Sequence, residues 1–135
     1  MSVPETAFLD TSVIVRYLTD DPPALAARAA QIIDSEQKLI VSELVLVETA
    51  YVLASVYQTP RAAIVDALSL LVQKANLRLF TLPKPLALEA LHLCRNSQRY
   101  SFTDAFLWAF ARHVGIPHIY TFDGRFPSDA ILLYA

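Results

Sequence analysis

The chain has 135 residues, of which 55% are hydrophobic, and its formal net charge at pH 7 is −2. This length predicts one domain, residues 1–135, with a core that buries roughly two thirds of the unfolded surface. The charge argues mildly against a broad nucleic-acid-binding face, although it allows a small basic rim around an acidic site. Because the chain has only two glycines and no Gly-rich loop, nucleotide-binding motifs of the P-loop and Rossmann kinds are excluded.

No segment of the sequence is typical of export or of a membrane span. The longest apolar stretch, residues 44–54, is interrupted by Glu48 and Thr49 and is too short to cross a bilayer. Residues 1–5 lack the basic and apolar regions of a signal peptide. The single cysteine, Cys94, excludes a disulfide framework. These features predict a cytoplasmic protein.

The N-terminal half of the chain alternates short apolar runs with segments of helical periodicity. Pro22 and Pro23 end the first helix, because proline lacks a backbone donor and disfavours helix in the residue before it. Ser42 is a favourable N-cap for the helix that begins at Glu43. The predicted order is a strand at 6–9, helices at 12–18 and 24–35, a strand at 38–41 and a helix at 43–57.

The C-terminal half continues this alternation. Pro60 suits the first position of a helix, Thr103 is a candidate N-cap, and Gly115 is a candidate left-handed C-terminal cap. The predicted order is a helix at 60–72, a strand at 77–82, helices at 85–95 and 104–114, and strands at 118–121 and 130–134. Strands that alternate with helices imply right-handed crossovers. The expected fold is α/β, a doubly wound parallel sheet of four to five strands flanked by helices.

Asp10 occupies the junction between the first strand and the first helix. In open parallel sheets, ligand sites lie at this carboxyl end of the strands. Taken alone, however, Asp10 is more typical of a helix N-cap or of an acid in the first helical turn. The same alternative holds for Asp104, which opens a helix after Thr103. Asp123 precedes Gly124, and Asp-Gly is an ordinary turn pair.

Glu48 is harder to explain as a structural residue. It shares one face of its helix with Leu44 and Val52, which lie four residues before and after it. A lone acid is rarely fully buried without a partner. Structural burial or exposure at the edge of the helix is the alternative, but the pattern favours a functional acid.

Asp10 and Asp123 both follow predicted strands directly. If these strands are adjacent and parallel, the carboxylates lie within about 5 Å of each other, near the spacing of strands in a sheet. At an effective dielectric of about 20 they would repel by about 3 kcal/mol, which a cation between them would relieve. Oxygen ligands suit Mg²⁺ or Mn²⁺, and the three histidines show no zinc-site spacing.

Two surface features are expected, an apolar surface for self-association and a basic rim around the acidic site. The third and fourth predicted helices expose apolar groups beyond the needs of one core face, which favours a two-fold homodimer. These groups include Val56, Tyr57, Ile64 and Leu71. Five arginines offer a basic rim, although each is also typical of a solvated surface charge: Arg16, Arg95, Arg99, Arg112 and Arg125.

Four segments carry a resemblance to a known family. In chain order they are residues 8–14 (FLDTSVI), 43–48 (ELVLVE), 101–105 (SFTDA) and 121–126 (TFDGRF). Together they resemble the four motifs of the PIN-domain nucleases and, within that group, of the VapC-type toxins of bacterial and archaeal toxin–antitoxin pairs. The resemblance covers essentially the whole chain, with the motifs in the same order.

The resemblance implies a Mg²⁺- or Mn²⁺-dependent endoribonuclease that forms a homodimer and binds a small antitoxin protein. By motif match, the acidic catalytic and metal-binding positions fall on Asp10, Glu48, Asp104 and Asp123. Thr121 matches the hydroxyl residue that supports the last acid, and Thr11 and Ser12 match a variable position with at most a supporting role. Glu43 is a stand-in candidate if Glu48 points away from the site.

The implied reaction is metal-assisted hydrolysis of RNA phosphodiester bonds, with Asp10 and Asp104 as direct ligands. Glu48 and Asp123 would bind the metal, hold its waters or act as general base. One competing hypothesis is a haloacid-dehalogenase-like phosphatase, but that family needs a second aspartate where Ser12 stands. Two others are a catalytically silent PIN-like module that binds RNA or protein, and a structure-specific DNA nuclease, for whose extra elements the chain lacks room.

Overall fold

The computed structural model describes residues 3–81, 83–96 and 99–135, with backbone alone at residue 96. Leu82, at the end of the predicted third strand, and residues 97–98, in a predicted loop, lie outside the described residues. The described strands are β1 Thr6–Leu9, β2 Lys38–Ser42, β3 Leu77–Phe80, β4 His118–Tyr120 and β5 Leu132–Tyr134. The described helices are α1 Thr11–Thr19, α2 Pro23–Ile33, α3 Glu43–Ser55, α4 Arg61–Val72, α5 Lys84–Asn96 and α6 Phe102–Val114.

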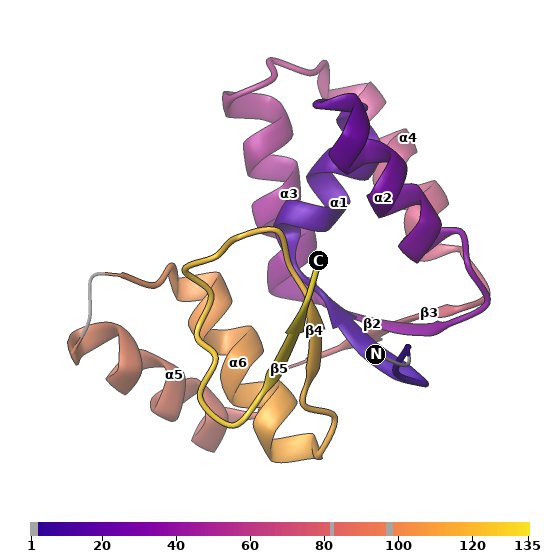
Figure 1. Cartoon of the computed structure of the whole chain (residues 1–135). Coiled ribbons are helices and arrows are strands. Elements are labelled where there is room, and N and C mark those ends of the chain that lie inside the picture. Colours follow the sequence, from indigo (N-terminus) through magenta and orange to yellow (C-terminus); the bar gives the residue numbers. More distant parts are fainter. Residues whose placement is uncertain (1–2, 82, 97–98) are drawn as a thin grey trace.

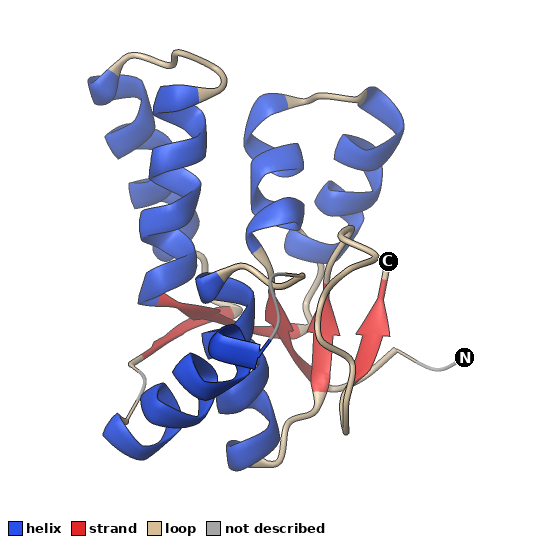
Figure 2. Ribbon diagram, turned by 90° about the vertical axis from the view of Figure 1, so that its left-hand side faces the viewer, coloured by secondary structure: helices blue, strands red, loops and turns tan. Residues whose placement is uncertain are grey.

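The strands form one parallel sheet in the order β3-β2-β1-β4-β5. The chain winds outward from β1 to β3 and then returns to the other side of β1 for β4 and β5. Helices α1 to α4 gather in the upper part of Figure 1 and α5 and α6 at its lower left, so that helices cover both faces of the sheet (Figures 1 and 2). The expected doubly wound α/β fold is confirmed, and its strand order reverses between β1 and β4.

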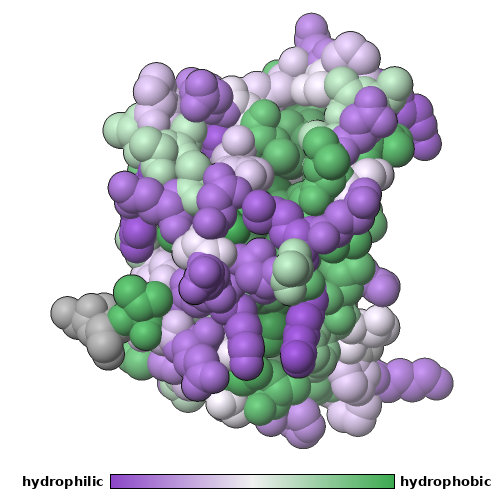
Figure 3. All heavy atoms as spheres, turned by 90° about the vertical axis from the view of Figure 1, so that its right-hand side faces the viewer, coloured by the Kyte–Doolittle hydropathy of each residue, from purple (hydrophilic) through white to green (hydrophobic). Residues whose placement is uncertain are grey.

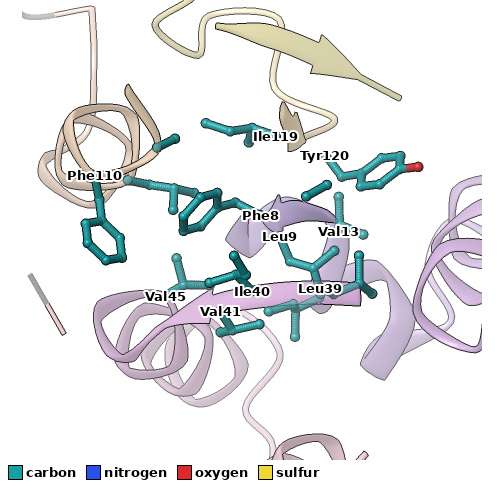
Figure 4. Packing of buried hydrophobic residues seen from close by; sticks show 14 of the residues in the cluster. Phe8, Leu9, Val13, Leu39, Ile40, Val41, Val45, Phe110, Ile119 and Tyr120 are labelled. Atoms are coloured by element: carbon teal, nitrogen blue, oxygen red, sulfur yellow. The ribbon is translucent and has the colours of Figure 1, made fainter. Parts of the chain in front are cut away.

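The core forms around β1, the central strand. Phe8 lies between Ile40 of β2 and Ile119 of β4 in the register of the sheet, and all three are buried. The strand runs are apolar without alternation because helices cover both faces of a parallel sheet. Phe110 of α6 packs its ring on that of Phe8, with the ring centroids 5.7 Å apart (Figure 4). This packing fixes the end of β1, where Asp10 follows.

Some of the helix caps predicted from the sequence are present in the structure, and one is not. Ser42 caps α3 by accepting a hydrogen bond from the Leu44 N–H, as predicted. Gly115 ends α6 with a φ of 76°, which only glycine adopts without strain, so this prediction is also confirmed. Thr103 as N-cap of α6 is wrong, because the Ser101 hydroxyl accepts from the Asp104 N–H and the helix begins at Phe102.

Several predicted boundaries also shift. Pro60 precedes α4 as its N-cap residue, so it is not the first helical residue. The last strand begins at Leu132 because Ala130 adopts a φ of 59° and the Ile131 N–H bonds to the Ser128 carbonyl in a turn. The fourth strand ends one residue early, at Tyr120. In the part of the chain that the structure describes, no helix has the length and apolar character needed to cross a lipid bilayer.

The apolar surface of α3 and α4 differs in detail from the prediction. Val56 is exposed, but Ile64 and Leu71 are buried in the core, and Tyr57 is half-buried. Figure 3 looks onto the side of the molecule where α2 and α4 lie and shows apolar groups among hydrophilic ones in its upper right part. The large exposed apolar residues of the two helices are Leu44, Val47, Tyr51, Val65 and Leu70.

Candidate active site

A cleft of about 340 Å³ contains all four acids that the sequence singled out. Each acid comes from a different part of the fold. Asp10 follows β1, Glu48 lies within α3, Asp104 lies in the first turn of α6, and Asp123 lies in the loop after β4. The cleft adjoins the carboxyl ends of β1 and β4, between which the strand order reverses, and such switch points are where open α/β sheets bind ligands.

Asp10 is almost completely buried, with 2% of its surface exposed. It is the N-cap residue of α1 by position, but its side chain makes no capping hydrogen bond, so capping does not explain it. Its Oδ2 accepts hydrogen bonds from the hydroxyls of Ser12 at 2.9 Å and Thr121 at 2.7 Å. Its Oδ1 is buried and has no hydrogen-bond partner among the described residues. One oxygen is therefore held in place, and the other lacks the partner that a buried polar atom normally has.

Two hydroxyls connect the beginning of α1 with the loop after β4. The Thr121 Oγ1 accepts from the Asp123 N–H at 3.0 Å, and the Ser12 Oγ accepts from the Phe122 N–H at 2.9 Å. The same hydroxyls donate to Asp10, so each one orders both a carboxylate and the loop. Thr11 lines the cleft, but its buried hydroxyl has no hydrogen-bond partner in the described part of the chain.

The expectation that Asp123 directly follows its strand is wrong. β4 ends at Tyr120, whose carbonyl accepts the Asp10 N–H at 3.0 Å, and Asp123 lies three residues farther along. The side chain hydrogen-bonded to Asp10 at this sheet edge is the Thr121 hydroxyl. A neutral donor in this position avoids the repulsion of two adjacent carboxylates. The condition on which this expectation depended is met, because β1 and β4 are adjacent and parallel.

Asp104 is a strongly perturbed acid of the cleft. Burial, followed by the negative charges of Asp10, Glu48 and Asp123, raises the pKa of Asp104 to about 8. Burial also raises the pKa of Asp10, against the opposing effect of the hydrogen bonds from Thr121 and Ser12. Crowded carboxylates of this kind favour either a bound proton or a bound cation.

Glu48 and Asp123 are more accessible than the two buried aspartates. Glu48 and Val52, one turn apart on α3, both line the cleft, as their shared helix face predicts. Glu43 is exposed and borders a different hollow, so it is not the α3 acid of this cleft. The Oδ1 of Asp123 accepts from the Arg125 N–H at 2.9 Å, which fixes its orientation in the loop.

The donor set of the cleft fits a hard divalent cation. All four candidate ligands offer carboxylate oxygen, and the buried Oδ1 of Asp10 is available for a bond. Within the described residues, no three acidic, histidine or cysteine side chains lie close enough to surround one ion directly. This spacing is compatible with Mg²⁺, which commonly keeps several waters and takes one or two protein carboxylates.

Three further polar residues line the cleft: Arg16, Tyr57 and Ser101. Arg16 belongs to the expected basic rim, whereas Tyr57 and Ser101 were not among the predicted site residues. Arg16 is spaced four residues from Ser12, so a shared helix face was a usable signal. No local sequence pattern points to Tyr57, because its hydrogen bond with Arg16 joins residues 41 positions apart and forms only when the chain folds. Of the other arginines of the expected rim, Arg125 borders Asp123, and Arg112 pairs with Glu89.

Comparison with known proteins agrees with this geometry. The family model described as "PIN domain" matches residues 7–130. Among solved structures, VapC20 from Mycobacterium tuberculosis, a toxin that cleaves the sarcin-ricin loop, superposes with a TM-score of 0.75 at 26% sequence identity, over 93% of this chain and 96% of that chain. VapBC2 from Rickettsia felis, bound to a DNA fragment from its promoter, has a TM-score of 0.66 at 14% identity, over 96% and 97% of the two chains, and shows the same fold.

Among curated proteins, none matches the sequence. The family match nevertheless spans most of the chain and includes all four acids of the cleft. The predicted resemblance is thus confirmed by the family match, and the chain belongs to the PIN-domain family.

Proposed function

We propose that this protein is a Mg²⁺- or Mn²⁺-dependent endoribonuclease and the toxin of a toxin–antitoxin pair. The observation that carries the proposal is Asp10, a buried carboxylate with one unpartnered oxygen in a cleft that three more acids line. Family membership supports a nuclease, and similarity to the RNA-cleaving toxin VapC20 favours RNA as the substrate. The expected site of action is the cytoplasm.

In the proposed mechanism, Asp10 and Asp104 hold the cation, and Ser12 and Thr121 keep Asp10 in a single orientation. A bound divalent cation would polarise the scissile phosphate and lower the pKa of the attacking water. Because the pKa of Asp104 is about 8 without metal, its carboxyl group would give up a proton at neutral pH when it holds the cation. Glu48 and Asp123, which are more accessible, orient the water and accept its proton.

The direct test is cleavage of a labelled RNA by purified protein with Mn²⁺, with chelator, and after the substitution Asp10→Asn. We expect cleavage only with the metal and a loss of at least about a hundredfold in Asp10→Asn, since the amide keeps the size of the side chain but lacks the charge that the cation needs. The matched control is Glu43→Gln, an exposed acid of α3 outside the cleft.

Undiminished cleavage by a folded Asp10→Asn variant would contradict the assignment. RNA binding without cleavage under all metal conditions would indicate the catalytically silent module instead. Circular dichroism of the variants separates loss of activity from loss of fold.

The proposed partners are the RNA substrate, a cognate antitoxin protein and a second copy of the chain. Exposed apolar residues on α3 and α4 support the homodimer, because Val47, Tyr51 and Val65 are 68%, 70% and 56% exposed. These residues occupy a surface that a two-fold interface would cover. Light scattering at micromolar concentration, without antitoxin, is expected to give twice the monomer mass, and a purely monomeric mass would contradict the dimer.

A further inference from the structure

Arg16 is the only basic residue among the described residues that line the acidic cleft. It lies on α1, four residues after Ser12, and therefore on the helix face that carries the hydroxyl bound to Asp10. A single cation in a cleft with four carboxylates would normally form an ion pair with one of them. Within the described part of the chain, no ion pair joins Arg16 to any carboxylate.

Neutral groups hold the Arg16 side chain instead. Its Nη1 donates to the Tyr57 hydroxyl at 3.0 Å and to the Asp21 backbone carbonyl at 3.2 Å. The Tyr57 hydroxyl in turn donates to the Asp21 Oδ2 at 3.4 Å, which leaves its oxygen free to accept from Arg16. These contacts hold the guanidinium between α1 and the residues after α3 without a direct ion pair among the described residues, and the carboxylate of Asp21 reaches it only through the Tyr57 hydroxyl.

Arg16 also keeps an unused donor. Its Nε is buried and has no hydrogen-bond partner among the residues that the structure describes. A buried N–H without an acceptor is costly, and the cost is greater for a charged group. Such a donor is retained more readily where a ligand completes it, and the same cleft holds a second buried polar atom without a partner in the described chain, Oδ1 of Asp10.

We propose that Arg16 binds a backbone phosphate of the RNA next to the scissile one and so positions the strand over the acids. This inference rests on the ribonuclease function proposed above. The guanidinium fork matches a phosphate group, whereas the four carboxylates repel the RNA backbone. A bound cation offsets that repulsion only at the scissile phosphate, and Arg16 supplies attraction at the neighbouring one.

The alternative role is purely structural: Arg16 ties α1 to the end of α3 through Tyr57. That role depends on the hydrogen bonds, and it leaves the salt dependence of RNA binding unchanged. Phosphate binding depends on the charge, and each phosphate contact contributes about 0.7 to the slope of log affinity against log salt for single strands. The two roles therefore differ in a measurable quantity that is independent of stability.

The test is fluorescence anisotropy with a short, labelled, single-stranded RNA of mixed sequence, titrated in Mn²⁺ at several KCl concentrations. All proteins carry Asp10→Asn so that the RNA stays intact. Arg16→Met is compared with Arg16→Lys, which keeps the charge, and with Arg28→Met, which removes an exposed arginine of α2 that does not line the cleft.

We expect Arg16→Met to weaken RNA binding on the order of tenfold and to lower the salt slope by about 0.7. Arg16→Lys should keep most of the slope, and Arg28→Met should match the parent. An unchanged slope in folded Arg16→Met, or equal losses in Arg16→Met and Arg16→Lys, overturns the phosphate role while the nuclease proposal stands. Absence of RNA binding by the Asp10→Asn parent overturns the phosphate role alone, because that parent lacks a proposed ligand of the cation, and the nuclease proposal then stands or falls on the cleavage assay.

Discussion

The two oxygens of the Asp10 carboxylate have different environments, and the difference comes from single hydroxyl groups. Oδ2 is occupied by Ser12 and Thr121, and Oδ1 is buried without a partner in the described chain. Thr121 also accepts the N–H of Asp123, so one hydroxyl orders two acids from different sides of the cleft. Valine has nearly the shape of threonine but lacks the hydroxyl, so valine at position 121 would make neither contact.

Replacing Thr121 with valine is therefore expected to lower the affinity for Mn²⁺ by about 10- to 100-fold, the usual effect of losing a group that orients a metal ligand. Isothermal titration calorimetry measures this affinity. The matched control is Thr49→Val, because Thr49 is fully buried and its hydroxyl donates to the Val45 carbonyl within α3. Equal Mn²⁺ affinities in the two variants would show that Thr121 does not orient the site.

At the scale of single residues, the sequence predicts which acids line the cleft better than it predicts which side chains contact one another beside them. The structure brings Asp10, Glu48, Asp104 and Asp123 to one cleft, as their motifs predicted. The Arg16–Tyr57 contact joins residues 41 positions apart in the sequence, and no local pattern encodes it. Tertiary contacts of this kind depend on how helices pack, which single-residue preferences leave open.

Helix ends set the positions of functional side chains at the scale of the element. Asp104 faces the cleft because α6 begins at Phe102 with Ser101 as its cap. The sequence offers two hydroxyls, Ser101 and Thr103, either of which can cap a helix. Local preference did not distinguish them, whereas the left-handed conformation at Gly115 was predictable because only glycine adopts it without strain.

Substituting alanine for Gly115 tests that conformation. A φ of 76° costs an L-residue about 1–2 kcal/mol, so Gly115→Ala should lower the free energy of unfolding by that amount. Gly124→Ala is the control, since that glycine has no positive φ and no atom within 4 Å of an added Cβ. Urea denaturation measures both, and equal stability of the two variants would contradict the assigned cap of α6.

The crowding of carboxylates affects the stability of the whole molecule. The pKa of Asp104 is about 8 in the folded state, against roughly 4 for an aspartate in the unfolded chain. Between these values the folded protein retains a proton that the unfolded chain releases, so the free energy of unfolding falls as pH rises from about 4 to about 8. Burial shifts the pKa of Asp10 in the same direction. Metal-free protein should therefore lose stability toward neutral and mildly alkaline pH.

Thermal melts of wild type and Asp104→Asn, in chelator and in millimolar Mn²⁺, test this prediction. In chelator near pH 8 the variant should be the more stable protein, because one buried repelling charge is gone. Mn²⁺ at a hundredfold excess over its dissociation constant adds about 2.7 kcal/mol to wild type, a shift in Tm on the order of 10 °C. Equal Mn²⁺ shifts in the two proteins would remove Asp104 from the site.

The four acids also come from chain positions that span nearly the whole sequence, from Asp10 after the first strand to Asp123 after the fourth. The central strand β1 acquires its neighbour β4 only when the chain returns from the far edge of the sheet. A growing polypeptide on the ribosome therefore holds an incomplete set of carboxylates until residue 123 has been added. The acidic cleft is therefore complete only in the finished fold, and any activity that needs all four carboxylates is absent from the incomplete chain.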